Sequence, residues 1–195
     1  AIDVKVIVIT GKDNVFSKGA SLKELDKMTP KEARRFSDFG WKVINKMSEI
    51  EQPVISAVNG DAFDNGLDLC MAADIRIASD KARFGLPGIK LGLIPSWGGT
   101  QRLLFLLGPS KAKELLFTGD IIEAEEALRI GLVNRVVPSD KLLDEVYSLG
   151  ARIQKNDFDA VGLAKDSINR SIENLLRFGS AIERGNFTIT SFFIK

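Results

Sequence analysis

Apolar runs alternate with amphipathic segments along the chain, and this alternation gives the first picture of the fold. Runs rich in β-branched residues predict buried strands, at residues 4–10, 54–58, 74–78 and 132–138. After the first run, apolar residues recur three or four positions apart and predict an amphipathic helix. Thr29-Pro30 starts this helix and Pro53 lies beyond its end. Strands that alternate with helices favour an α/β domain.

Further helices are expected downstream, at residues 66–73, after Gly98, at 111–118 with Ser110 as the cap, at 124–130 before Gly131, and at about 140–154 and 158–176. The remaining tail, NFTITSFFIK, is apolar and carries no terminator.

The bulk composition excludes several classes of chemistry. The 195 residues fit one domain with a substantial core, and a net charge of +1 predicts neither a nucleic-acid partner nor a membrane surface. Because histidine is absent, Ser-His-Asp and Cys-His catalysis and the usual zinc sites are excluded, and no metal is predicted. The single cysteine, Cys70, is expected to be a buried structural thiol. This fits the cytoplasm, or an organelle matrix if a targeting segment is missing.

Two loops share features that suit anion binding. In FSKGASLKEL, Gly19 and Ala20 lead into an expected helical turn, and in FDNGLDL, Asn65 and Gly66 open the short helix. Backbone N–H groups at a helix start favour negative charge. Two such groups aimed at one carbonyl would stabilise an enolate or a tetrahedral oxyanion. Taken alone, the pattern also fits two ordinary turns.

Four segments, in order, resemble the crotonase superfamily of enoyl-CoA hydratases and isomerases: VKVIVITGKDNVFSKGASLKEL, QPVISAVNGDAFDNGLDLCMAADIRIAS, ARFGLPGIKLGLIPSWGGTQRLLFLLG and LLFTGDIIEAEEALRIGLVNRVVP. The resemblance implies an α/β, crotonase-like fold of repeated β-β-α units. We therefore expect a core over residues 1–138 and a C-terminal helical region, shorter than usual, over 139–195. It also implies a coenzyme A thioester as substrate, no separate cofactor, and a homotrimer or a dimer of trimers.

The resemblance also assigns site residues by position. It places the oxyanion hole at the N–H groups of Ala20 and Asn65. Lys23 would contact the CoA nucleotide portion, or be a solvated loop charge. The other expected substrate contacts are Lys18, Gly19, Phe63, Gly66, Leu86, Pro95, Ser96 and Trp97. Of these, Ser96 also fits a turn residue and Trp97 a packing residue.

The sequence departs from the family pattern where hydration needs two glutamates. Asp68 replaces one of them with a side chain that is one methylene shorter, and Gly88 replaces the other with no side chain at all. Asp64 stands where the family has glycine, and fits a solvated turn residue, an N-cap or a relocated acid. We therefore expect an enoyl-CoA hydratase-like enzyme. Alternatives are an isomerase, another crotonase-type reaction, or a catalytically weak acyl-CoA-binding homologue.

Overall fold

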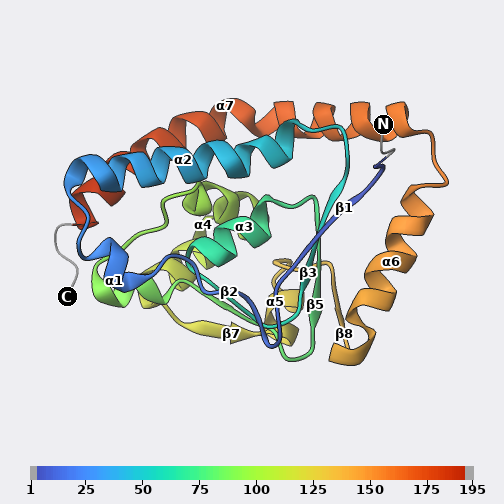
Figure 1. Ribbon diagram of the computed structural model, residues 1–195, viewed down its shortest axis with the longest axis horizontal. Coiled ribbons are helices and arrows are strands. Elements are labelled where there is room, and N and C mark those ends of the chain that lie inside the picture. The colour runs from blue at the N-terminus through green and yellow to red at the C-terminus, as the bar shows by residue number, and fades with distance from the viewer. Residues whose placement is uncertain (1–3, 192–195) are drawn as a thin grey trace.

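Two four-stranded sheets form the centre of the molecule in the computed structural model, which describes residues 4–191 (Figure 1). The first sheet has the order β1-β3-β5-β8 and is wholly parallel, with strands β1 (Ile7–Thr10), β3 (Val54–Val58), β5 (Ile75–Ser79) and β8 (Arg135–Val137). The second has the order β2-β4-β6-β7, with strands β2 (Val15–Ser17), β4 (Asp61–Phe63), β6 (Arg83–Gly85) and β7 (Ile121–Glu123). Its last strand, β7, is antiparallel to β6.

The chain crosses from the first sheet to the second in each repeat. Strands β1, β3 and β5 are each followed by a short strand of the second sheet and then by helix, so the repeated β-β-α organisation is confirmed. The second sheet itself was not predicted. Its strands are only three residues long, which is too short for a two-residue alternation to stand out.

Nine helical segments complete the described chain, namely α1 (Leu22–Leu25), α2 (Pro30–Glu49), α3 (Asn65–Ala72), η1 (Pro87–Leu91), α4 (Gly99–Thr118), α5 (Ala124–Arg129), η2 (Ser139–Lys141), α6 (Leu142–Ile153) and α7 (Phe158–Thr190). The predicted start of α2 is confirmed, because the Thr29 side chain and Glu32 form a reciprocal capping box there. Gly131 has a φ of 83° just beyond α5, as a glycine that ends a helix should.

One helix prediction is wrong. The last helix runs through Thr190 rather than ending near residue 176, because buried positions continue through Ser180, Glu183 and Phe187 at helical spacing. Gly179 and Gly185 lie inside it. The separate helix expected near Ser110 is confirmed, because Gly108 has non-helical angles of φ 74° and ψ 168° and divides α4 in two, although the second part begins at Pro109 rather than after Ser110. The tail residues 192–195 lie outside the described residues.

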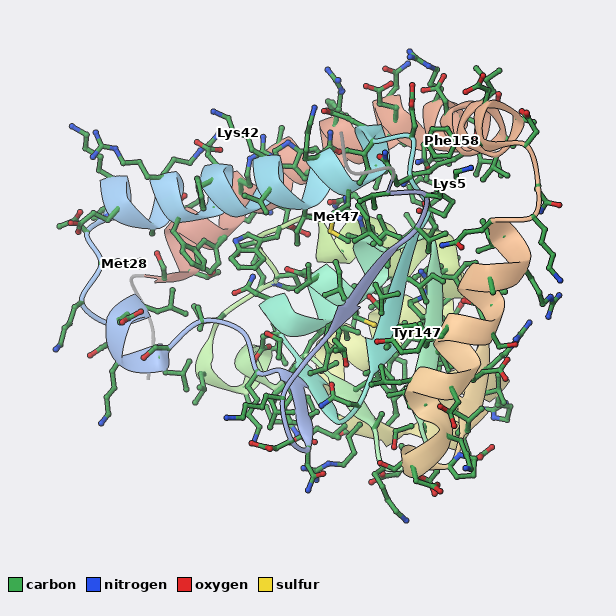
Figure 2. The ribbon with its side chains drawn as sticks, turned by 45° about the vertical axis from the view of Figure 1, so that its right-hand side comes forward. Lys5, Met28, Lys42, Met47, Tyr147 and Phe158 are labelled. Atoms are coloured by element: carbon green, nitrogen blue, oxygen red, sulfur yellow. The ribbon has the colours of Figure 1, made fainter. Side chains whose placement is uncertain are left out.

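Helices α2 and α7 lie side by side along one edge of the molecule, and α3 and α4 lie beneath them (Figure 1). In Figure 2, Lys42 projects outward from α2, whereas Met47 lies on the side of α2 that faces the rest of the molecule. Met28 lies in the connection between α1 and α2. No helix within residues 4–191 combines the length and the apolar character needed to cross a membrane.

The core explains why so short a helix as α3 is stable. α3 carries apolar residues on nearly every side, and Leu67, Cys70 and Met71 are buried among residues of both sheets and of α4. Cys70 is confirmed as a buried thiol, and burial raises its pKa to about 12. On the other face of the first sheet, α6 packs against β3 and β5. The start of α3 is therefore held rigidly between the two sheets and the helical layer.

Candidate active site

The two glycine-containing loops meet at the start of α3. Gly19 has a φ of 80°, and a Cβ there would lie 3.0 Å from the Asn65 nitrogen and 3.2 Å from the Phe63 carbonyl oxygen. A Cβ on Gly66 would lie only 2.0 Å from the Ser17 carbonyl oxygen. Both positions require glycine because the backbones of the β2–α1 loop and of α3 approach so closely. The chain thus brings together two loops that are more than forty positions apart, as the predicted hole requires.

Both residues predicted to form the hole, Ala20 and Asn65, lie at this junction. Asn65 is the first residue of α3, so its N–H has no acceptor within the helix. Ala20 directly follows Gly19 and packs against the small cluster formed by Leu25, Ala33 and their neighbours. The positive end of the α3 dipole lies at the same point, and it favours developing negative charge.

The Asn65 side chain ties the start of α3 to the loop before α4. Its Nδ2 donates to Asp68 Oδ2 at 3.2 Å and to Ser96 Oγ at 3.0 Å. Ser96 is completely buried, and its carbonyl oxygen accepts a hydrogen bond from Ser37 Oγ on α2 at 2.8 Å. These contacts fix the orientation of residue 65, and with it the direction of its backbone N–H.

Asp68 lies one helical turn further in and is sealed from solvent. Its Oδ2 also accepts from the Trp97 N–H at 3.2 Å, whereas Oδ1 has no hydrogen-bond partner within residues 4–191. A Cβ on Gly99 would lie 1.9 Å from that Oδ1, so the backbone of the α4 start packs directly on it. Burial and the nearby charge of Glu183 raise the pKa of Asp68 to about 8. Near neutral pH the carboxyl is therefore mostly protonated.

Glu183 is a buried carboxylate that the sequence reasoning missed. It extends from α7 and accepts from the Gly98 N–H at 2.6 Å, the Thr100 N–H at 2.8 Å and the Thr100 hydroxyl at 2.5 Å. Burial raises the pKa of Glu183, and these hydrogen bonds oppose the shift. The sequence did carry a sign of its burial, because Glu183 lies at helical spacing from the buried residues Leu176, Ser180 and Phe187. A carboxylate on the buried face of a helix is expected to be paired or hydrogen-bonded to specific groups.

Replacing Asp68 with asparagine is expected to flatten the dependence of stability on pH. The Asp68 carboxyl ionises at about pH 8 in the folded chain and near 3.8 when unfolded, so between these values the folded state binds the extra proton. Stability from this group is therefore complete below about pH 4 and is lost as pH rises toward 8, by up to about 1.4 kcal/mol per pH unit. Urea unfolding from pH 4 to 8 measures the difference between wild type and D68N. A constant difference across that range would contradict the expectation.

Asp64 stands at the entrance to α3 in an unusual backbone conformation, with φ 48° and ψ −121°. It occupies the N-cap position of α3, and its carbonyl oxygen accepts from the Asp68 N–H at 3.0 Å, but its side chain makes no capping hydrogen bond. Asp64 is half-buried, so its side chain is partly rather than fully solvated. Its Oδ1 instead accepts from the Gly88 N–H at 2.9 Å, and a Cβ on Gly88 would lie 2.8 Å from the same oxygen. The relocated-acid interpretation of Asp64 stays a prediction.

The other residues predicted to contact the substrate differ in their burial and in their partners. Leu86 and Pro95 are buried on either side of η1, and Phe63 lies under the Arg83 guanidinium at 5.7 Å. Lys18 is paired with Asp61 at 3.2 Å. Lys23 is exposed on α1.

Trp97 contributes to the site through its backbone rather than through its ring. Its ring lies 5.3 Å from that of Phe36, and a Cβ on Gly40 would lie 2.0 Å from Trp97 Nε1. The packing interpretation of Trp97 therefore describes its ring, whereas its N–H donates to Asp68.

A cavity of about 430 Å³ lies elsewhere, between the C-terminal end of α3, α4 and α7. Met71, Phe105, Lys165 and Ile168 are among its lining residues, and none of the predicted site residues lines it.

Comparison with known proteins gives a consistent result. Residues 2–192 match a family model described as enoyl-CoA hydratase/isomerase. A crotonyl-CoA hydratase of Syntrophomonas wolfei is 43% identical over 185 residues, which cover 94% of this chain and 71% of that protein. A short-chain-enoyl-CoA hydratase of Clostridium acetobutylicum is 44% identical over 172 residues, which cover 88% of this chain and 66% of the relative.

Solved structures agree in fold. An enoyl-CoA hydratase from Bacillus anthracis superposes with a TM-score of 0.85 at 37% identity, covering 96% of this chain and 73% of that one. An enoyl-CoA hydratase/isomerase from Xanthobacter autotrophicus superposes with a TM-score of 0.91 at 26% identity, and the match covers 100% of this chain and 73% of that one.

Proposed function

Because the chain belongs to the enoyl-CoA hydratase/isomerase family, we propose that it binds an enoyl-CoA thioester and adds water across the carbon–carbon double bond. One observation carries the proposal. The Gly19-Ala20 loop packs against the start of α3, where a Cβ on Gly19 would lie 3.0 Å from the Asn65 nitrogen, and this close approach supports an oxyanion hole made by the N–H groups of Ala20 and Asn65. Two relatives that are 43% and 44% identical to this chain are named as a crotonyl-CoA hydratase and a short-chain-enoyl-CoA hydratase.

In this proposal the amides act on the thioester oxygen. When water attacks the β-carbon, the π electrons of the double bond move toward the thioester and the oxygen gains negative charge as an enolate forms. The N–H groups of Ala20 and Asn65, together with the α3 dipole, stabilise that charge more than they stabilise the neutral substrate. The bonds from Asn65 to Asp68 and Ser96 keep the donor in position, so no reorganisation is needed during the reaction.

Asp68 is the proton donor in the proposed reaction. Its raised pKa, about 8, keeps a proton on the carboxyl at neutral pH. In the proposal that proton passes to the α-carbon of the enolate, which completes the addition of water and requires the α4 start, which packs on Asp68 Oδ1, to move aside. The proposed donor lies one helical turn from the Asn65 amide, and therefore one turn from the carbonyl that this amide would hold.

Two alternatives follow from particular residues. An isomerase moves a proton between two carbons of the same substrate, and a single carboxylate suffices for it, which suits a site without an acid at Gly88. A catalytically weak acyl-CoA-binding homologue would keep the hole without moving protons, which suits the sealed position of Asp68.

Hydration of crotonyl-CoA separates these functions. The purified chain is expected to remove the ultraviolet absorbance of the enoyl thioester and to form 3-hydroxybutyryl-CoA, identified by mass spectrometry. A chain that binds crotonyl-CoA but leaves it unchanged would contradict the hydratase proposal. Conversion of a 3-enoyl-CoA to its 2-enoyl isomer, without hydration, would identify an isomerase instead.

We also propose the domain division and assembly that the family resemblance implies. Residues 1–138 would form the catalytic core, and residues 139–195 a helical region that covers it. The proposed homotrimer, or dimer of trimers, agrees with apolar side chains that α7 exposes, including Leu175, Phe178 and Ile182.

A further inference from the structure

The space beside Gly88 is occupied by a side chain from another element. A Cβ on Gly88 would lie 2.8 Å from Asp64 Oδ1 and 3.2 Å from Asp64 Cγ. The Gly88 N–H donates to the same Oδ1 at 2.9 Å. A carboxylate is therefore present where a side chain at position 88 would begin, but it comes from the start of α3 rather than from η1.

The backbone conformation of Asp64 is strained. Within residues 4–191, only Asp13 and Asp64 combine a side chain with a positive φ. The pair of angles at Asp64, φ 48° and ψ −121°, is one that residues other than glycine rarely adopt. Glycine would relieve the strain, so the retention of a carboxylate at this strained point indicates a use for it.

Asp64 is also the more accessible of the two carboxyl groups on this face of α3. Asp68 has no exposed surface, whereas Asp64 is only partly buried. Asp64 directly precedes Asn65, whose N–H belongs to the proposed hole, and a Cβ on Gly19 would lie 3.4 Å from Asp64 Cβ. Asp64 therefore lies directly beside the proposed hole, where a bound thioester would be held.

We propose that Asp64 is the catalytic base of this site and takes the place of an acidic side chain at position 88. The inference rests on the proposed hydration reaction. As the water oxygen bonds to the β-carbon, one O–H bond of the water breaks and its proton passes to the Asp64 carboxylate, while the π electrons form the enolate. Asp68 then gives its proton to the α-carbon. After product release Asp64 loses its proton to solvent and Asp68 regains one, so the net change is the addition of one water.

The surroundings of Asp64 suit this role. Burial raises the pKa of Asp64, and the hydrogen bond from Gly88 opposes that rise. A carboxylate with a raised pKa is a stronger base toward water, and the Gly88 hydrogen bond orients it.

The decisive variant is Asp64→Asn. Asparagine tolerates positive φ, and its Oδ1 can still accept from the Gly88 N–H, so the local geometry is retained while the base is removed. We expect kcat for crotonyl-CoA hydration to fall about 10²–10⁴-fold with little change in KM. Asp13→Asn is the matched control, since Asp13 also has a positive φ but lies in an exposed turn, and it should leave activity unchanged.

A relocation experiment supplies an independent test. Gly88→Glu alone should collide with Asp64 and lower activity. Combined with Asp64→Gly, which clears that space, Gly88→Glu should restore activity at least about 10-fold over Asp64→Gly alone. The melting temperature of each variant verifies folding, and that of Asp64→Gly should rise because glycine relieves the strain.

The possible failures are distinguishable. Wild-type chain that hydrates crotonyl-CoA while Asp64→Asn does so equally well would overturn the role of Asp64 and leave the hydratase proposal intact. A loss in Asp64→Asn that appears only in KM, or a double variant no better than Asp64→Gly, would also overturn it. Wild-type chain without any hydration would overturn the proposed function, and with it this role.

Discussion

Replacing Asn65 with proline is expected to lower kcat for enoyl-thioester hydration by about 10²–10³-fold, the usual cost of losing one oxyanion-hole donor. Proline has no backbone N–H, and it is well tolerated at the first position of a helix, which Asn65 occupies in α3. The substitution therefore removes one of the two proposed hole donors while leaving a residue that suits a helix start. KM should change much less, because the donor acts mainly on the charge that develops in the transition state.

The matched control is Asn65→Ala, because proline also removes the asparagine side chain. Alanine loses the bonds to Asp68 Oδ2 and Ser96 Oγ but keeps the backbone N–H. The ratio of kcat between Asn65→Ala and Asn65→Pro therefore isolates the amide, and circular dichroism verifies that α3 still folds in both. Equal rates for the two variants would exclude the Asn65 amide from the hole.

Local patterns predicted the elements whose evidence lies within a few residues. The run at residues 54–58 became β3 with the same bounds, because a short run of small and β-branched residues without a charge is typical of a strand buried on both faces. Thr29-Pro30 marked the start of α2 because capping chemistry is local. The three-residue strands of the second sheet were missed, since they form by pairing with partners distant in sequence, such as β4 with β6.

The same limit applies to the site. The family resemblance predicted that the loops at Gly19 and Asn65 belong to one hole, and the close backbone approach at Gly19 and Gly66 agrees with that prediction. The resemblance could not show that Asp64 fills the space beside Gly88, because that contact joins two positions where the chain departs from the family pattern. A contact between two such positions is recognised only when their side chains are seen together.

Glu183, on the C-terminal helix α7, influences the proposed acid Asp68 through its hydrogen bonds and its charge. It lies 85 positions beyond Gly98 in the sequence, yet its carboxylate holds the start of α4, whose backbone at Gly99 packs on Asp68 Oδ1. Its charge also helps to raise the pKa of Asp68. The proton on Asp68 therefore depends on α7, which links the C-terminal helix to the chemistry proposed at α3.

Replacing Glu183 with alanine is expected to lower the free energy of unfolding by about 3–5 kcal/mol. The change leaves the N–H groups of Gly98 and Thr100 and the Thr100 hydroxyl without their acceptor in a buried place, and each unsatisfied buried group costs about 1–3 kcal/mol. Urea unfolding measures the loss. Glu173→Ala is the control on the same helix, since Glu173 forms only a surface ion pair with Arg177 and should cost no more than about 1 kcal/mol.

Glu183→Gln separates the charge of this residue from its hydrogen bonds. Glutamine keeps an oxygen that can accept from the α4 start, so it should be destabilising by less than alanine. With the negative charge gone, the pKa of Asp68 should fall from its raised value. The free energy of unfolding should then stop declining at a lower pH than in the wild type. Hydration activity should also fall at a lower pH, because Asp68 would lose its proton there. If the alanine variant were no less stable than Glu173→Ala, Glu183 would not hold α4. If Glu183→Gln left the pH range of the decline unchanged, its charge would not act on Asp68.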